Sequence, residues 1–159
     1  MDPWSHADAM WAERIVTAEA PPSLDVGWLP VLGRVPMFRS LSRRHLRRIA
    51  RLTELRRFTK GADVVRAGAR GNVFYIILVG RAQVTTPRGR GRTLGPGDWF
   101  GELALLDGAP RAATVTALER LTTARISRAA FRELLDMEPS MGLGLCDGLV
   151  AIIRDLQGE

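Results

Sequence analysis

The sequence contains few of the residues on which disulfide, metal and nucleophile chemistry depends. Cys146 is its single cysteine, and His6 and His45 are its two histidines. One cysteine excludes an internal disulfide and thiolate-rich zinc or iron–sulfur sites, and neither histidine has a second ligand at a metal-binding spacing. With so few histidines, no Ser–His–Asp or Cys–His catalytic arrangement can be identified. We therefore expect no metal site, no prosthetic group and no enzymatic activity.

Long apolar runs and a secretory signal are also missing. No uninterrupted apolar run approaches the roughly 20 residues that cross a bilayer. The start of the chain, MDPWSHADAM, has neither the basic nor the apolar region of a secretory signal. Together with the single cysteine, these absences predict a cytoplasmic protein without a membrane span. The 159 residues, 46% of them hydrophobic and 25% charged, are enough for one compact domain with a core.

Lysine is almost absent, so arginine carries the positive charge. The chain has 23 basic and 17 acidic residues, a formal net charge of +6. Residues 39–57 hold eight arginines against one acid, Glu54. Such a run can meet nucleic acid, acidic lipid or an acidic partner, but no aromatic residues interleave with the arginines as single-strand binding favours. We interpret it as a solvated helix face.

The N-terminal third predicts two helices of different kinds. Trp11–Ala20 has the pattern of a short amphipathic helix that Pro21-Pro22 stops, and we assign residues 1–33 to an N-terminal extension. Ser42–Thr53 places apolar residues at helical spacing on one face and arginines on the other. The second segment is therefore predicted to be an amphipathic helix with a basic outer face.

Between residues 55 and 126 the pattern changes to short strands. Runs rich in Val, Ile, Thr and Phe are separated by glycine-bearing turns, which fits six to eight strands. The run Val73–Val79 is apolar throughout and bounded by Gly71 and Gly80, which is typical of a strand buried on both faces. Regular short strands with dense turns favour a barrel or roll.

Two helices are predicted after the strands. Ser127 is a candidate N-cap for a helix over Arg128–Asp136, and Pro139 can open a final helix through Gly158. The final helix has glycines that weaken it, so packing on the roll or on a second subunit must stabilise it. Its apolar stripe consists of Leu145, Leu149, Ile152, Ile153 and Leu156. The predicted fold class is α+β: a mainly-β roll (double-stranded β-helix or jelly roll) flanked by an N-terminal helix and two C-terminal helices.

The stretch LGPGDWFGELALLDGAPRAATV, residues 94–115, has the residue types of an anion cradle. Gly101 allows the backbone to approach a ligand, and the N–H groups that open the following helical turn attract phosphate. Arg111 adds charge and a fork of donors that matches phosphate oxygens. Glu102 would repel that phosphate, so its carboxylate is better suited to accept a hydrogen bond from a sugar hydroxyl.

This stretch resembles the phosphate-binding cassette of the cyclic nucleotide-binding domain family. The family pattern is F-G-E-[LI]-[AS]-L followed closely by P-R-[AST]-[AS]-[TSV], and the chain has FGELAL at 100–105 and PRAATV at 110–115. The resemblance extends over roughly residues 34–157. It implies a nucleotide-binding β-roll with flanking helices at 34–138 and a C-terminal lid helix at 139–159.

The resemblance also implies roles for individual residues. Arg111 would pair with the cyclic phosphate, Glu102 would bind the ribose 2′-hydroxyl, and backbone N–H groups near Gly101, Ala104 and Ala112 would complete the cradle. The expected ligand-binding residues are Gly101, Glu102, Leu103, Ala104, Arg111, Ala112 and Ala113. The last helix would cover the base, with Leu149, Ile152 and Ile153 as lid candidates. Family members that prefer cyclic GMP often have Thr or Ser where this chain has Ala112, which favours cyclic AMP over cyclic GMP.

Three functions are consistent with these features. The first is a cyclic nucleotide sensor that moves its C-terminal helix to regulate a separate protein effector. The second is a fragment of a transcription regulator, although no helix-turn-helix fits between the lid helix and Glu159, so direct DNA binding is not expected. The third is an interaction module that has lost its ligand, in which Glu102 and Arg111 form a buried ion pair. The apolar stripe of the last helix permits a homodimer.

Overall fold

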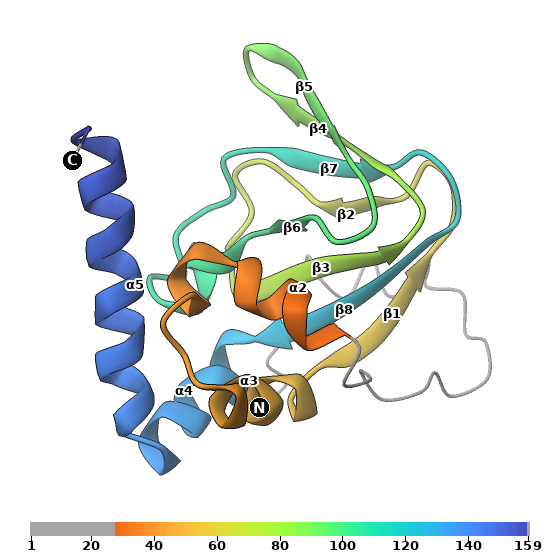
Figure 1. The fold of residues 1–159 in the computed structure, drawn as a ribbon. Coiled ribbons are helices and arrows are strands. Elements are labelled where there is room, and N and C mark those ends of the chain that lie inside the picture. Colours follow the sequence, from red (N-terminus) through yellow and green to blue (C-terminus); the bar gives the residue numbers. More distant parts are fainter. Residues whose placement is uncertain (1–27, 159) are drawn as a thin grey trace.

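The computed structural model describes residues 28–158, so the helix expected at Trp11–Ala20 lies outside the described residues. This part of the chain begins with short helices, continues through eight strands and ends with two longer helices (Figure 1). In order, the elements are α2 (Leu29–Arg34), η2 (Pro36–Phe38), α3 (Arg43–Arg51), β1 (Glu54–Phe58), β2 (Asp63–Val65), β3 (Val73–Val79), β4 (Ala82–Thr86), β5 (Gly89–Leu94), β6 (Trp99–Phe100), η3 (Glu102–Leu105), β7 (Thr114–Ala117), β8 (Leu121–Ser127), α4 (Arg128–Met137) and α5 (Ser140–Leu156).

The strands form two four-stranded sheets that face each other as a roll (Figure 1). One sheet has the order β1-β8-β3-β6 and the other β2-β7-β4-β5, and the paired strands run antiparallel. This arrangement confirms the predicted α+β roll with flanking helices.

Strand β3 lies between two separate hydrophobic cores. Six of its seven residues are buried, and their side chains alternate between the two sides because successive residues of a strand point to opposite faces. Phe74 and Ile76 pack with the helices, whereas Tyr75 and Ile77 pack inside the roll. Residues 73–79 are therefore apolar because the strand is buried on both faces, as predicted from the sequence.

The helical core is organised around three phenylalanines from distant parts of the chain. Phe38 of η2 contacts Phe74 of β3 edge-on and Phe131 of α4 at a tilt, with 5.9 Å between ring centroids in both pairs. The N-terminus of α4 is capped as predicted, because the Ser127 hydroxyl accepts a hydrogen bond from the Ala130 N–H at 3.1 Å. Helix α4 is thereby fixed directly to the end of β8.

Helix α2, the first helix in the described part of the chain, belongs to this core. Leu29 and Leu32 are buried within it, although both residues lie in the segment assigned to the N-terminal extension. A boundary at residue 33 therefore does not separate the extension from the core. The helix has only six residues, which is too short to show a helical period in the sequence.

Helix α5 packs against η2 through glycines, along one side of the molecule (Figure 1). A Cβ atom at Gly148 would lie 2.8 Å from the carbonyl oxygen of Met37, and one at Gly144 would lie 2.8 Å from a methyl carbon of Leu41. The glycines that weaken the isolated helix thus allow it to approach η2 closely. Helix α5 also exposes Leu143, Val150 and Ile153, and Leu156 at its C-terminal end. Within residues 28–158, no helix is both long and apolar enough to span a membrane.

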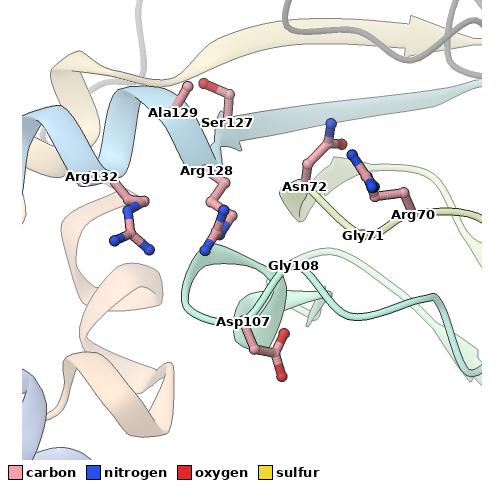
Figure 2. A pocket seen from close by; sticks show the side chains of 9 residues that line it. All are labelled: Arg70, Gly71, Asn72, Asp107, Gly108, Ser127, Arg128, Ala129 and Arg132. Carbon is pink, nitrogen blue, oxygen red and sulfur yellow. The ribbon is translucent and has the colours of Figure 1, made fainter.

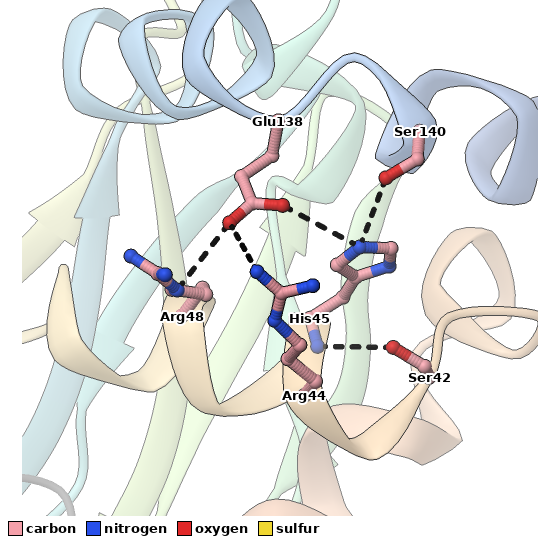
Figure 3. Close-up of polar contacts among 6 residues, drawn as sticks. All are labelled: Ser42, Arg44, His45, Arg48, Glu138 and Ser140. Carbon is pink, nitrogen blue, oxygen red and sulfur yellow. Dashed lines mark hydrogen bonds and ion pairs between the residues drawn. The ribbon is translucent and has the colours of Figure 1, made fainter.

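The basic face of α3 is only partly solvated. Arg44, His45 and Arg48 surround the carboxylate of Glu138, which lies between α4 and α5 and is 12% exposed (Figure 3). The three nitrogen–oxygen distances are 3.6, 3.8 and 3.4 Å, and His45 also contacts the Ser140 hydroxyl at 3.2 Å. We refer to these residues as the Glu138 cluster. It joins α3 to the junction of α4 and α5, which is a contact that the sequence analysis did not predict.

Candidate ligand-binding site

A cavity of about 320 Å³ lies beside η3 and the loop that follows it. This volume lies within the range of small-molecule sites. All seven residues expected to bind ligand line the cavity. The full lining consists of residues 65, 84, 100–104, 107, 109–113 and 115. The fold therefore brings the predicted residues together on one wall, and their roles in binding stay predictions.

Gly101 is required by the close approach of Arg111 to the backbone. Its φ of 79° is in the left-handed region, where side chains other than glycine are strained. A Cβ atom here would overlap the Arg111 guanidinium and would lie 3.0 Å from the carbonyl oxygen of Val73. The turn thus leaves room for the arginine side chain beside the cavity.

Arg111 is held in position by its backbone and by its side chain. Its N–H donates to the carbonyl oxygen of Ala69 at 2.7 Å, and its own carbonyl accepts from the N–H of Gly68 at 2.7 Å. Its Nη2 also donates to the carbonyl oxygen of Val73 at the start of β3. The guanidinium is therefore positioned by the 68–69 loop and by β3, in agreement with an arginine that is preorganised for an anion.

Glu102 is the first residue of η3 and is partly buried on the same wall. Its carboxylate makes no ion pair or side-chain hydrogen bond with any residue in the described part of the chain. The described structure therefore lacks the Glu102–Arg111 ion pair of the interaction-module alternative. A carboxylate beside a cavity is suited to accept hydrogen bonds from a hydroxyl group.

The backbone donors near the cavity differ in their availability. The Ala104 N–H donates to the Gly101 carbonyl at 3.0 Å, so the turn of η3 already uses it. Neither the Ala112 nor the Ala113 N–H donates a backbone hydrogen bond to another described residue. These two donors directly follow Arg111, so the backbone and the guanidinium offer donors side by side, an arrangement that suits an anion. Across residues 28–158, no group of three or more His, Cys, Asp or Glu is placed to hold a metal ion.

The strands contribute an apolar part of the lining, which the cassette pattern does not indicate. Val65, Val84, Phe100 and Val115 come from four different strands. Phe100 stacks on Tyr75 with 5.1 Å between ring centroids, so its position is fixed by the core of the roll. The alternating pattern of each strand contains the signal for inward-facing residues, but it does not show which strands border the cassette.

The lid candidates lie away from the cavity. Leu149 and Ile152 pack partly buried against the helical core, Ile153 is 53% exposed, and none of the three is part of the cavity lining. Helix α5 would have to leave its present position on η2 to cover a ligand. Their role in covering the base therefore stays a prediction.

Comparison with known proteins gives consistent results. The family model described as "Cyclic nucleotide-binding domain" matches residues 55–138. A cAMP-dependent protein kinase regulatory subunit from Mycosarcoma maydis is 42% identical over 110 residues, which are 64% of this chain. The matched region is 21% of the length of that fungal protein, so the chain spans about a fifth of it.

Solved structures share the fold. The N-terminal domain of a transcriptional regulator from Streptomyces coelicolor A3(2) aligns with a TM-score of 0.72 and 24% identity, over 79% of this chain and 94% of that one. The regulatory domain of Toxoplasma gondii PKA, solved with cAMP, aligns with a TM-score of 0.60 and 32% identity, over 74% of this chain and 46% of that one. The first likeness establishes the fold, and the second extends to the sequence.

Proposed function

The chain belongs to the cyclic nucleotide-binding domain family, and on this premise we propose that it is a sensor that binds cyclic AMP, and less readily cyclic GMP, in the cavity beside Gly101. The chain is a regulatory domain distantly related to the regulatory subunits of cAMP-dependent protein kinase. Domains of this kind are generally non-catalytic. The nucleotide, the residue roles and the mechanism of signalling belong to the proposal.

The observation that carries the proposal is that Arg111 and Glu102 line the same cavity. The guanidinium of Arg111 offers paired donors to the cyclic phosphate, and the adjacent Ala112 and Ala113 N–H groups add to them. The Glu102 carboxylate, which has no partner among the described residues, accepts the ribose 2′-hydroxyl. The apolar residues that the strands contribute to the lining receive the remainder of the nucleotide.

The preference for cyclic AMP depends on Ala112. A hydroxyl at this position, as in relatives that prefer cyclic GMP, can reach the guanine amino group, and alanine has none. The preference therefore arises because cyclic GMP lacks a hydrogen-bond partner at this position, and not because cyclic AMP gains one. The lid candidates on α5 are apolar, so they would offer the base no hydrogen bond that distinguishes adenine from guanine.

Signalling would pass from the cavity to α5 through the helical core. Leu105 of η3, Phe131 of α4 and Leu145 of α5 pack in one cluster, and Nη2 of Arg128 donates to the carbonyl oxygen of Leu106 at 3.1 Å. A nucleotide that binds more tightly to one arrangement of η3, α4 and α5 than to another would shift the population toward that arrangement. The partner is a separate protein effector or a second copy of the chain, which would meet the exposed apolar face of α5. This signalling takes place in the cytoplasm.

Calorimetric titration with cyclic AMP and cyclic GMP tests the proposal. The wild-type chain is expected to bind cyclic AMP saturably and more tightly than cyclic GMP. Arg111→Ala and Glu102→Ala should each weaken cyclic AMP at least about tenfold, because each removes a charge-assisted contact of about 1.5–3 kcal/mol. Arg111→Lys should recover only part of the affinity, since lysine keeps the charge but lacks the planar fork.

Arg90→Ala is the matched control, because Arg90 is an exposed arginine of β5 outside the cavity. It should bind cyclic AMP with the wild-type affinity. If neither nucleotide binds or raises the thermal stability at millimolar concentration, the sensor proposal fails and the interaction-module alternative gains support.

A further inference from the structure

A second cavity, of about 630 Å³, shares Asp107 with the first and is otherwise lined by different residues. Three of its lining residues are arginines (Figure 2). Arg128 and Arg132 extend from α4 toward the Asp107–Gly108 turn, and Arg70 lies across from them in the loop before β3 (Figure 2). The cavity is therefore surrounded by positive charge contributed by two separate segments of the chain.

Acidic residues do not neutralise this charge. In the part of the chain that the structure describes, Arg70, Arg128 and Arg132 form no ion pair with an aspartate or glutamate. Asp107 is the one acid in the lining, and its Oδ1 accepts the Ala109 N–H at 2.9 Å. Figure 2 shows its carboxylate directed away from the guanidinium groups. Three like charges around one cavity repel each other, and an anion between them would relieve the repulsion.

Arg128 is fixed in the wall of the cavity. Its Nη2 donates to the Leu106 carbonyl. Its Nε lies next to Gly108, where a Cβ atom, if present, would be 3.5 Å away. That Nε is buried and has no hydrogen-bond partner in the described structure. A buried donor without an acceptor costs about 1–3 kcal/mol. The guanidinium is thus held at the cavity wall by its contact with Leu106, and its buried Nε is left without a partner among the described residues.

The backbone N–H groups at the start of α4 already have hydrogen-bond acceptors within the protein. The Arg128 N–H donates to the Asn72 carbonyl at 2.8 Å, and the Ser127 hydroxyl caps the Ala130 N–H. Recognition of an anion here must therefore come mainly from the three side chains. The N-terminal end of α4, which has ten residues, adds positive potential in the same direction.

We propose that this second cavity binds the phosphate groups of a small phosphorylated molecule of the diphosphate or triphosphate class. Guanidinium forks match phosphate oxygens, and arginines on two sides suit more than one phosphate group. The lining contains no aromatic residue, so the anionic group rather than a base or ring would be recognised. The inference does not depend on nucleotide binding in the first cavity, because the two linings share only Asp107.

Titration of the full chain with inorganic pyrophosphate tests this site. The measurement is made at about 0.15 M ionic strength, where the Debye length of about 8 Å suppresses unspecific attraction. Saturable binding is expected for the wild-type chain. Arg70→Gln and Arg132→Gln, both at exposed positions, should each raise the dissociation constant about tenfold. Arg128→Gln should have a larger effect, but it also removes the Leu106 contact, so the two exposed variants decide.

Two control variants identify the site that is occupied. Arg111→Gln removes the anion-binding arginine of the first cavity, so it shows whether pyrophosphate occupies that cavity instead. Arg90→Gln alters an exposed residue of β5 and should bind pyrophosphate as the wild-type chain does. The inference is overturned if pyrophosphate does not bind at millimolar concentration. It is also overturned if Arg111→Gln abolishes binding while Arg70→Gln and Arg132→Gln do not, or if Arg90→Gln weakens binding equally. Thermal unfolding of each variant shows that it is folded.

Discussion

At the scale of single residues, a comparison of Gly97 with Gly101 distinguishes backbone strain from a steric clash with a neighbouring side chain. Both have a left-handed backbone, with φ values of 89° and 79°. A Cβ atom at Gly97 would meet no atom within 4 Å, whereas one at Gly101 would overlap the Arg111 guanidinium. Replacing either glycine by alanine introduces the same kind of strain, and only the second replacement displaces a neighbour.

Gly97→Ala should lower the free energy of unfolding by about 1–2 kcal/mol, the strain of a left-handed alanine. Gly101→Ala should lower it by at least about 1 kcal/mol more, because overpacking is added to that strain. Urea denaturation of the two variants beside the wild type measures both values. Equal losses would mean that Arg111 moves aside freely and that this turn needs glycine only for its backbone conformation.

At the scale of elements, helix α5 contains two glycines in contrasting surroundings. Gly148 faces the Met37 and Pro36 carbonyl oxygens, at 2.8 and 3.0 Å from the position of a Cβ atom, and Gly142 has no atom within 4 Å of that position. Carbonyl oxygens of the backbone cannot rotate away as the end of a long side chain can. The two sites therefore respond oppositely to the same substitution.

Gly142→Ala should raise the free energy of unfolding by up to about 1 kcal/mol, because alanine has the higher helix propensity. Gly148→Ala should lower it by about 1–3 kcal/mol, because the methyl group forces α5 away from η2. Chemical denaturation gives the sign of each effect, and hydrogen exchange of the α5 amides shows whether the helix has been released. A stabilising Gly148→Ala would contradict the close contact between α5 and η2.

At the scale of the whole molecule, the Glu138 cluster connects the beginning of the domain to its end. Helix α3 precedes the roll and the α4–α5 junction follows it, so the contacts of Glu138 with Arg44, His45 and Arg48 link segments on both sides of the roll (Figure 3). The exposed pair Arg81–Glu119 offers a comparison, because its distance of 3.3 Å is shorter while its side chains are 61% and 48% exposed. Burial rather than distance should decide which interaction matters.

Glu138→Gln should lower the free energy of unfolding by about 1–2 kcal/mol. This is less than the 3–5 kcal/mol typical of a broken buried pair, because Arg44 and Arg48 are partly solvated. Glu119→Gln should change it by less than about 0.5 kcal/mol. Urea denaturation of both variants measures the difference. If the two losses are equal, the Glu138 cluster is no more than a surface ion pair.

The sequence predicts features that are contiguous in the chain. The strand Val73–Val79 is recognisable because burial on both faces leaves no polar residue in its run. The cassette residues Gly101 to Ala113 are recognisable because one loop carries nearly all of the polar wall of the first cavity. Local capping is equally visible, and Ser127 forms the predicted cap.

Features that depend on distant segments were not predictable in this way. His45 and Glu138 are separated by most of the domain, and nothing near either residue indicates the other. Arg70 and Arg132 are unremarkable surface arginines until the fold brings them to one cavity. From the sequence, Gly148 is only a residue of low helix propensity, because propensity takes no account of the surface against which the helix packs.

The contact of α5 with η2 also determines how the helix can move. A rotation by one residue, about 100° around the helix axis, would bring Asp147 or Leu149 to the place of Gly148 beside the Met37 carbonyl, where a Cβ atom does not fit. Gradual rolling is therefore blocked, and the helix has one seated orientation from which it must detach to change. A movement of α5 would therefore be a step from this contact to a detached position, with no intermediate rotation that keeps the contact.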